Sequence, residues 1–528
     1  MRADFITSEV VAAYPTAGCL APEWWESVRL GPCDCDRHRA EQARDVGADA
    51  IDTHCLRQMF DAGVLRWVDT AAPSAPHHCG RAFARPDGRV IFHPAHFNEN
   101  PASAPPPLAL PSPRLVCEAL HEATFVFIAD LKSWYYQVPI PATARAAFRW
   151  WVRDGSTWRQ AELTRLAMGW RGSAAAADSA TRAIAGVPAH QQWDSPDGID
   201  SIVYIDDVAC TSRAAAERFR RGVSRAGVEL KSESETTSGL VLFIGIQLRI
   251  PGGMFRVAPR LLGKLQRAAR RFRPLSSDSA RRRLAGLCVA VLERAGMCLA
   301  TGREVWDLTL PGRQEGVPPR GGEALASSAL KAILRDAALW RSVVAPTAVC
   351  YGASDASNLG WGWIWRDSPA PRWGQGNWRA PLHINFLEAI ALLRAVRQAP
   401  PASELRIYCD NEVVVRWVSK GTSRVKFACT LILRIERVLI EKGCRLLAQY
   451  IPSHLNIADG LSRGDASPAS FTLPPWQVSY PRRVLGWAAP QTSPRPACED
   501  VREASESDSA SSAAWEQTSL DDAWGGGD

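Results

Sequence analysis

Long apolar runs are absent from this sequence, and so is the cysteine spacing of a disulfide scaffold. No run reaches the about 18 apolar residues that a membrane helix needs, so we expect no membrane span. The first residues also lack the basic and then apolar pattern of a secretory signal. The 14 cysteines are scattered without CxxC pairs, which is typical of reduced thiols. We therefore expect an intracellular protein, in either the nucleus or the cytoplasm.

Charge is distributed unevenly along the chain. The whole chain has a formal net charge of +7, whereas residues 496–528 carry nine acidic residues and one arginine. The remaining residues therefore carry a net charge of +15. A basic body with an acidic tail indicates a polyanionic partner for the body. A basic surface that serves only solubility is the alternative at this point.

The length of 528 residues predicts several domains. Proline- and alanine-rich residues 101–113 and glycine- and proline-rich residues 311–322 are typical of loops or linkers. We expect a helical region at 1–69, an α/β region at 70–250, a basic helical connection at 251–342, a second α/β block at 345–465 and a disordered acidic tail at 466–528. The tail is rich in Pro and then in Ser, Asp and Glu, so we expect it to complete neither core.

Two apolar segments of the first α/β region carry acidic residues at strand ends. ATFVFIADLKSWYYQ (123–137) ends a strand at Asp130, and SIVYIDDVAC (201–210) places Asp206 and Asp207 between two apolar runs. Burying a carboxylate is costly unless it is paired or binds a metal. Carboxylate oxygens suit Mg²⁺, and two such ions support in-line phosphoryl transfer. These acids therefore predict a two-metal site, the alternative being two turn residues of an ordinary hairpin.

The second α/β block repeats this pattern with four acids. Each acid lies at the end of a predicted element or on a helix beside a strand: Asp355, Glu388, Asp410 and Asp459. Four carboxylates around two Mg²⁺ ions can activate water against a phosphodiester. Helix caps and solvated charges are the alternative interpretation of each acid taken alone.

The first block resembles reverse transcriptases. Residues 204–207 (YIDD) match the YxDD box of that family, and DLKSWYYQ resembles its first acidic motif. LAMGWRGSAAAAD (166–178) is similar to the pattern L-P-x-G-W-x-G-S-P, with alanine replacing both prolines. LVLFIGIQL (240–248) resembles the hairpin that grips the primer. The resemblance implies a right-hand polymerase with fingers, a ferredoxin-like palm and a helical thumb.

The resemblance also implies substrate-binding residues. Arg89, nine residues before Asn98, matches the fingers arginine that meets the incoming triphosphate. Tyr135 stands where the family has an aromatic gate against ribonucleotides, and Gly169 and Tyr204 stand in nucleotide-binding motifs. Two positions depart from the family pattern: His93 replaces an Asp, and Lys231 occupies an Asn position while the later family lysine is absent.

The second block resembles ribonuclease H, an α/β fold with a mixed sheet. Its last box, IPSHLNIADGLSR, is similar to that of long-terminal-repeat, hepadnaviral and DIRS-type elements. Some relatives carry a catalytic His about ten residues before the last Asp, whereas His454 stands five before Asp459. We therefore interpret His454 as a structural or surface residue.

Together the two blocks resemble the reverse transcriptase/ribonuclease H segment of retroelements, with the DIRS/VIPER-like tyrosine-recombinase group most similar. The resemblance implies an α+β multidomain enzyme that uses Mg²⁺, or alternatively Mn²⁺. It implies an RNA template, a DNA primer, dNTPs and an RNA–DNA hybrid as partners, with no membrane and with element-encoded proteins as further partners. The alternatives are an inactive or domesticated nucleic-acid-binding relic, and an enzyme in which only the ribonuclease H is active.

Overall fold

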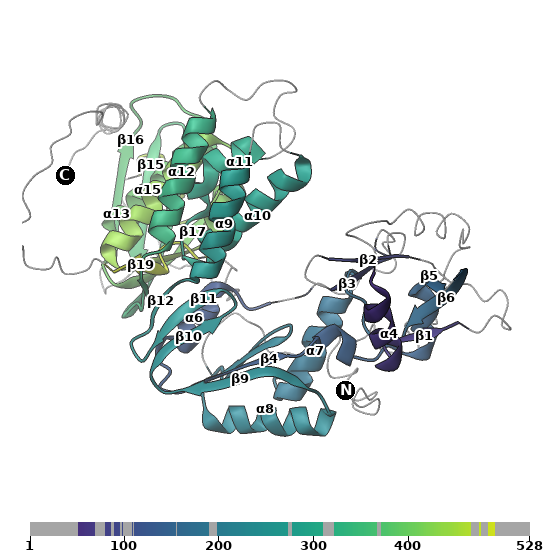
Figure 1. The fold of residues 1–528 in the computed structure, drawn as a ribbon. Helices are drawn as coiled ribbons and strands as arrows, with labels where there is room; N and C mark the ends of the chain where they lie inside the picture. Colours follow the sequence, from purple (N-terminus) through teal and green to yellow (C-terminus); the bar gives the residue numbers. More distant parts are fainter. Residues whose placement is uncertain are drawn as a thin grey trace, which may run out of the picture. The chain divides into compact units, whose positions relative to one another are not determined.

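The computed structural model describes residues 51–68, 80–85, 89–94, 98, 108, 110–154, 156–188, 198–272, 277–309, 322–366, 371–465, 475–476 and 484–491. The chain divides into two compact units (Figure 1). The first unit contains residues 1–111 and 123–239, and the second contains residues 112–122 and 240–528. No helix within the described ranges has both the length and the apolar character needed to cross a bilayer.

The central sheet of the first unit has four antiparallel strands in the order β7-β8-β4-β9. These strands are β4 (Val126–Leu131), β7 (Ser201–Tyr204), β8 (Asp207–Cys210) and β9 (Leu230–Thr236). Helix α7 (Ser173–Ala185) precedes β7 and is separated from β4 by an insertion at residues 132–172, and α8 (Arg213–Ala226) connects β8 to β9. The chain thus follows a β-α-β-β-α-β path with the strand order of a ferredoxin-like unit.

Small residues allow α7 and α8 to pack closely together. A Cβ on Gly222 of α8 would lie 1.9 Å from the carbonyl oxygen of Ile184 in α7, so only glycine fits there. Helix α7 is rich in alanine, and its side chains at 175–177 are buried. Figure 1 shows α8 running along the sheet that contains β4 and β9. The two helices therefore form one layer against the strands that carry the first acids.

Shorter elements complete the first unit. A three-stranded sheet has the order β1-β6-β5, and β2 pairs with β3. Their bounds are β1 (Leu65–Trp67), β2 (Arg81–Ala84), β3 (Val90–His93), β5 (Arg149–Asp154) and β6 (Thr157–Leu163), with helix α4 (Thr53–Asp61) and 3-10 helices η5 (Trp134–Gln137) and η6 (Ala142–Ala147). One apolar cluster includes buried residues from all three sheets of the unit. Of the predicted helical region at 1–69, only residues 51–68 are described, and they contain α4 and β1.

The second unit contains a five-stranded mixed sheet in the order β16-β15-β14-β17-β18. Its strands are β14 (Ala348–Ala356), β15 (Gly360–Arg366), β16 (Arg372–Asn377), β17 (Ser403–Cys409) and β18 (Arg445–Tyr450). Strand β14 is antiparallel to β15 and parallel to β17. The mixed sheet predicted for this block is therefore present.

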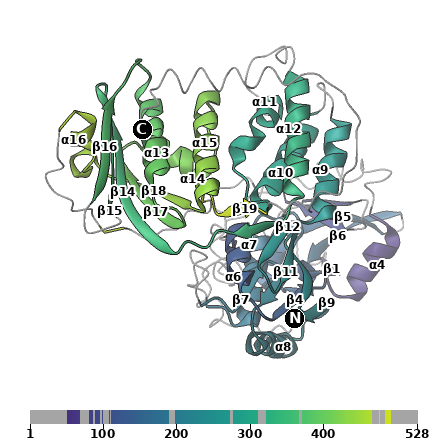
Figure 2. The ribbon, with the colours of Figure 1, turned by 90° about the vertical axis from the view of Figure 1, so that its left-hand side faces the viewer.

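Helices cover both faces of the mixed sheet. These helices are α13 (Ile384–Gln398), α14 (Glu412–Lys420), α15 (Lys426–Lys442) and the short α16 (Asp459–Ser462). Figure 2 shows α13 on one side of the sheet and α16 on the other. Trp361, Trp363 and Trp365 alternate along β15 and pack into the core on one face, as their spacing predicts.

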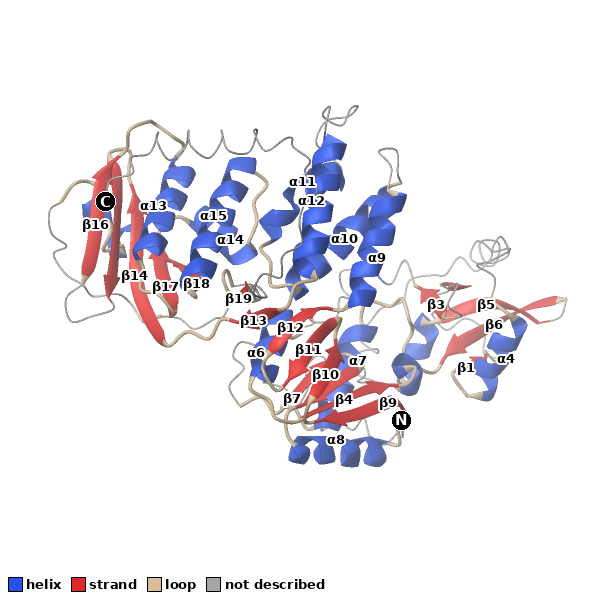
Figure 3. Ribbon diagram, turned by 60° about the vertical axis from the view of Figure 1, so that its left-hand side comes forward, coloured by secondary structure: helices blue, strands red, loops and turns tan. Residues whose placement is uncertain are grey.

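A second five-stranded sheet of this unit has the order β10-β11-β12-β13-β19 (Figure 3). Its strands are β10 (Gly239–Phe243), β11 (Ile246–Ile250), β12 (Met254–Val257), β13 (Arg341–Val343) and β19 (Ala488–Pro490). The remaining helices of the unit are α6 (Pro113–His121), α9 (Pro259–Arg271), α10 (Asp278–Arg294), α11 (Arg303–Thr309) and α12 (Gly322–Ala337), with 3-10 helices η7 (Leu299–Gly302) and η8 (Ser453–Leu455). The boundary expected at residue 250 therefore falls inside a sheet, between β11 and β12.

The prediction that residues 466–528 form a disordered tail is wrong for the described residues 484–491. Strand β19 pairs with β13, and the Trp487 ring stacks on Phe255 with centroids 5.2 Å apart. Val484 and Leu485 are also buried. Burial of this short apolar segment stabilises its position, although the Pro- and Ser-rich composition around it conceals the signal.

A second part of the same tail also packs on the second unit. Trp476 makes edge contacts with the rings of Tyr351 and Tyr408. The prediction that the tail completes neither core is therefore also wrong at this residue. Both contacts join positions far apart in the sequence, where local patterns carry no information.

Candidate active sites

The first unit brings Asp130, Asp206 and Asp207 together at one end of its central sheet. Asp130 of β4 lies opposite Asp207 of β8 in the strand register. Asp206 occupies the tight turn between β7 and β8, and its carbonyl oxygen accepts a hydrogen bond of 3.0 Å from the Leu131 backbone N–H. Because two neighbouring antiparallel strands and the turn beside them carry these acids, their carboxylates are held close together.

Burial and mutual repulsion destabilise the charged forms of these acids. Burial raises the pKa of Asp207 to about 7, and the charges of Asp206 and Asp130 contribute to the shift. Burial likewise raises the pKa of Asp206, and the charge of Asp130 acts in the same direction. Oxygen donors whose negative charges repel each other fit a divalent cation such as Mg²⁺.

Two cations act on the same acids. Lys231 of β9 forms an ion pair with Asp130, with the Nζ and Oδ2 atoms 2.5 Å apart. The positive charge of Arg89 partly offsets the rise in the pKa of Asp206, which is caused mainly by burial. Arg89 itself is exposed beside β3. The acid cluster therefore lies within electrostatic reach of two cations. Arg89 is the residue predicted to meet a triphosphate, and Lys231 occupies the Asn position of the family pattern.

The three aromatic residues after Asp130 have different environments. Trp134 is 2% exposed and donates a hydrogen bond to the Ala177 carbonyl, so it is a core residue. The Tyr136 hydroxyl donates to the Val90 carbonyl at 2.7 Å. Tyr135 is half-buried, and burial together with the charges of Asp206 and Asp178 raises its pKa to about 12. Of these three aromatic residues, Tyr135 is therefore the one whose pKa responds to the charge of the acid cluster.

Gly169 brings its loop against β3. Its φ is +112°, and a Cβ there would lie 2.2 Å from the Phe92 carbonyl oxygen. Asn98 donates a hydrogen bond of 2.8 Å to the Gly169 carbonyl and accepts one of 3.1 Å from the Arg171 N–H. Gly169 thus shapes the loop of its motif through close backbone contact. The predicted residue Tyr204 ends β7 half-buried and lies opposite Asp207, while the side chain of His93 lies outside the described residues.

The second unit brings its four predicted acids together around β14. The end of β14 carries Asp355, and Asp410 follows the parallel neighbouring strand β17. Glu388 lies on α13, and Asp459 is the first residue of α16. Three possible ligand atoms lie within 4.8 Å of one another, one each from Glu388, Cys409 and Asp410. This spacing is compatible with a metal ion.

Two of these acids, Asp355 and Glu388, are buried more deeply than the acids of the first unit. Asp355 is 2% exposed and Glu388 is 4% exposed. Burial raises the pKa of Glu388 to about 9, and the charges of Asp355 and Asp410 add to the effect. Burial and the charges of Asp410 and Asp459 also raise the pKa of Asp355. Among the described residues, Asp410 Oδ1 is a buried oxygen without a hydrogen-bond partner, so the donor set fits a divalent cation.

Sequence reasoning missed Asn456, a buried residue that joins Asp355 to the turn before Asp459. Its side-chain amide donates a hydrogen bond of 3.0 Å to Asp355 Oδ1, and its oxygen accepts one from the Ala458 N–H. The available signal was a polar residue three positions before Asp459 in an otherwise apolar turn. Arg463 binds Asp459 through two hydrogen bonds, and His454 is exposed on η8, as expected for a surface residue.

Sequence reasoning also missed two residues of α7 in the first unit. Asp178 accepts a hydrogen bond from the backbone N–H of Ile205, and the Thr181 hydroxyl donates to the carbonyl of the same residue. Ile205 immediately precedes Asp206 in the turn. The available signal was a lone acid in an alanine-rich segment, where a solvated charge would be the ordinary interpretation.

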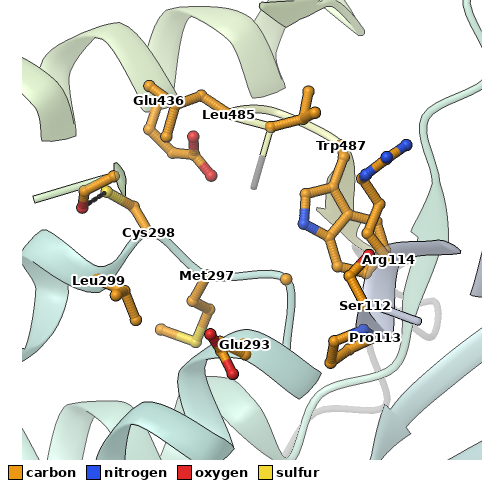
Figure 4. A pocket seen from close by; sticks show the side chains of 13 residues that line it. Ser112, Pro113, Arg114, Glu293, Met297, Cys298, Leu299, Glu436, Leu485 and Trp487 are labelled. Atoms are coloured by element: carbon orange, nitrogen blue, oxygen red, sulfur yellow. Dashed lines mark hydrogen bonds between the residues drawn. The ribbon is translucent and has the colours of Figure 1, made fainter. Parts of the chain in front are cut away.

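The second unit also contains a small cavity whose lining includes none of its four clustered acids (Figure 4). Its volume is about 40 Å³, and Arg114, Glu293, Glu436 and Trp487 contribute to its lining. Burial raises the pKa of Glu436 to about 7, and its carboxylate accepts a hydrogen bond from the Gly486 N–H. Ligand pockets usually measure about 300–1,000 Å³, so this cavity does not fit a nucleotide.

The chain is similar to solved structures, although no protein-family model and no curated protein matches it. One is the foamy viral protease-reverse transcriptase dRH in complex with double-stranded DNA, with 12% identity, a TM-score of 0.42 and coverage of 77% of this chain and 71% of that chain. Another is the foamy viral protease-reverse transcriptase in complex with double-stranded DNA, with the same identity and TM-score and coverage of 80% and 85%. A third holds an RNA/DNA hybrid, with 12% identity, a TM-score of 0.42 and coverage of 86% and 58%. Likenesses of this size do not establish a function, which has to be argued from the residues of the sites.

Proposed function

We propose that the chain is an RNA-directed DNA polymerase with an attached ribonuclease H. The observation that supports this most is the presence of two separate carboxylate clusters, one at the end of a ferredoxin-like antiparallel sheet and one around a mixed sheet. Along the chain, the cluster with the reverse-transcriptase-like motifs comes before the cluster with the ribonuclease-H-like motifs. A relic free of constraint would be expected to lose some of these seven acids.

In this proposal the central sheet of the first unit is the palm, and the shorter sheets form the fingers. Helices α9, α10, α11 and α12 form the thumb and connection. Asp130, Asp206 and Asp207 hold Mg²⁺, or alternatively Mn²⁺. When bound, two such ions activate an attacking hydroxyl and stabilise the leaving oxygen of an in-line displacement.

The remaining residues of the first site bind and select the nucleotide. Arg89 binds the triphosphate of the incoming dNTP, because it is exposed and its charge reaches Asp206. Lys231 places a second cation beside Asp130. Tyr135 fills the space beside the sugar C2′ and excludes a 2′-hydroxyl, while Gly169 and Tyr204 shape the nucleotide pocket.

The second site cleaves the RNA strand of the RNA–DNA hybrid that the first site produces. Asp355, Glu388, Asp410 and Asp459 hold the divalent ions, and Asn456 orients Asp355. The exposed basic residues of α9 and α10 contact the phosphate backbone, which provides affinity without reading sequence. We place the chain among retroelement proteins, nearest the DIRS/VIPER-like group because of the wording of its motif boxes as a set.

A paired assay tests the proposal. The full chain is incubated with Mg²⁺, dNTPs and a DNA primer on an RNA template, and in parallel with a labelled RNA–DNA hybrid. Primer extension and RNA cleavage together are the expected result. Cleavage without extension would favour an enzyme in which only the ribonuclease H is active, and binding without either reaction would favour the relic.

A further inference from the structure

The turn that carries Asp206 has an unusual backbone conformation. Ile205 has a φ of +62°, in the left-handed region that β-branched residues rarely adopt. A two-residue connection between β7 and β8 requires such a conformation, and glycine or asparagine is the usual residue there. A strained residue persists only where its surroundings hold it in place. Contacts around Ile205 therefore hold this conformation.

Two side chains of α7 hold both polar groups of Ile205. Asp178 Oδ1 accepts a hydrogen bond of 3.1 Å from the Ile205 N–H. The Thr181 hydroxyl lies 2.5 Å from the Ile205 carbonyl oxygen and 2.9 Å from that of Ala177. Because a hydroxyl has one hydrogen, the shorter distance favours donation to Ile205. Asp178 is 2% exposed and Thr181 is fully buried, so both side chains are shielded from water.

The carboxylate of Asp178 is itself fixed in orientation. Its Oδ2 atom accepts a hydrogen bond of 2.8 Å from Arg182 Nε, one helical turn further along α7. Each carboxylate oxygen therefore has its own donor. This leaves Asp178 no freedom to turn away from Ile205 without breaking a buried ion pair, which is costly.

We propose that Asp178 and Thr181 are positioning residues that hold the Ile205 turn in its left-handed conformation and thereby aim Asp206 and Asp207. This inference rests on the proposed polymerase function of the first site. The backbone carbonyl of Asp206 also accepts a hydrogen bond from the backbone N–H of Leu131, the residue after Asp130. A rotation of the turn would therefore shift Asp206 relative to Asp130. Helix α7 thus sets the geometry of an acid cluster to which it contributes no acid.

The first experiment uses a matched pair at Thr181 in the full chain. Thr181→Val removes the hydroxyl with little change of volume, and Thr181→Ser retains it. We expect Thr181→Val to lower the kcat of primer extension by about 10- to 100-fold, the usual cost of losing an outer-shell partner, with little change in the KM for dNTP. Thr181→Ser should restore most of the rate. Equal rates for both variants and the wild type would overturn the proposal.

The second experiment separates the ion pair from the contact with Ile205. Asp178→Leu combined with Arg182→Met replaces the buried pair with apolar side chains, a change that is often neutral for folding, but it removes the acceptor for the Ile205 N–H. Asp178→Asn combined with Arg182→Met keeps an acceptor oxygen. We expect the first double variant to lose primer extension about 10- to 100-fold and the second to lose much less. Similar losses in both variants would contradict the proposal.

Hydrogen exchange of the hairpin at 201–210 provides a readout that does not depend on activity. The Ile205 amide should be protected in the wild type and in Thr181→Ser, and should exchange faster in Thr181→Val and in the Asp178→Leu double variant. Unchanged protection would overturn the proposal even if the rates fell. A wild type without primer extension would refute the proposed function alone, because hydrogen exchange still decides whether α7 holds the turn.

Discussion

The two acid clusters differ in how their negative charge is balanced. In the first, Lys231 forms an ion pair with Asp130, and the charge of Arg89 reaches Asp206. In the second, Glu388 is 4% exposed, and its pKa is raised to about 9 by burial and by neighbouring carboxylates. Asp355 there receives a neutral amide from Asn456, while Arg463 forms an ion pair with the more exposed Asp459.

This difference matches what each site would bind. A site for a nucleoside triphosphate needs cations of its own, because the substrate brings several negative charges. A site that cleaves a diester backbone faces less substrate charge, so its carboxylates can repel each other until divalent ions bind. The comparison therefore predicts that the two sites, and the units that contain them, can be disabled separately.

The largest expected effect concerns the stability of the second unit alone. Trp487 is buried against Phe255 within that unit. Trp487→Ala should destabilise the second unit by about 3–5 kcal/mol, the usual cost of emptying a buried aromatic site. Thermal unfolding followed by calorimetry should show one transition moved to lower temperature and the transition of the first unit unchanged.

Trp373 provides the matched control for this prediction. It is 41% exposed on β16 of the same unit, so Trp373→Ala should change stability by less than about 0.5 kcal/mol. Equal shifts for the two variants would show that the segment at 484–491 does not contribute to the folded unit. Truncation after residue 483 should reproduce the effect of Trp487→Ala.

The next effect tests whether the two activities are separable. Asp206→Asn removes a proposed metal ligand. It should therefore lower primer extension by at least about 100-fold, which is the largest loss usual for residues that only support a metal ligand. It should leave hybrid cleavage intact, and Glu388→Gln should do the reverse. Asp154→Asn, at an exposed residue of the first unit, serves as the control. Loss of both activities from either site variant in a folded protein would contradict the two-site interpretation.

A third prediction concerns which sugar the first site accepts in an incoming nucleotide. Tyr135→Val should raise ribonucleotide use relative to deoxynucleotide use by roughly ten- to more than a hundredfold, because overpacking of a 2′-hydroxyl against the ring costs about 1–3 kcal/mol. Single-nucleotide incorporation with dNTP and rNTP measures the ratio. Tyr136→Phe removes only the hydroxyl that binds Val90 and should keep the wild-type ratio. An unchanged ratio in a folded Tyr135→Val enzyme would rule out the gate.

The smallest expected effect concerns the second site. Asn456→Ala removes the amide that orients Asp355 and should lower hybrid cleavage by about 10- to 100-fold without affecting primer extension. The exposed Asn358 provides a control in the same unit, and Asn358→Ala should keep both rates. A normal cleavage rate for Asn456→Ala would show that Asp355 is oriented without this amide.

Local patterns were enough to predict the acids and the elements that carry them. Asp130 and Asp410 could be found because an apolar strand followed by a carboxylate is a pattern of a few adjacent residues. The mixed sheet could also be predicted, since its strands and helices alternate in the sequence. The boundary at residue 250 could not, because strands β11 and β12 on either side of it belong to one sheet.

Local sequence patterns identify the acids that cluster in each unit, because burying an acid is costly and its presence in an apolar segment is informative. What holds those acids in place depends on tertiary contacts. Asp178 reaches Ile205 across 27 positions, and Asn456 reaches Asp355 across 101. The tertiary structure also decided that Trp487 stacks on Phe255, far away in the chain. Such contacts depend on how separate elements pack, and no pattern of neighbouring residues records that packing.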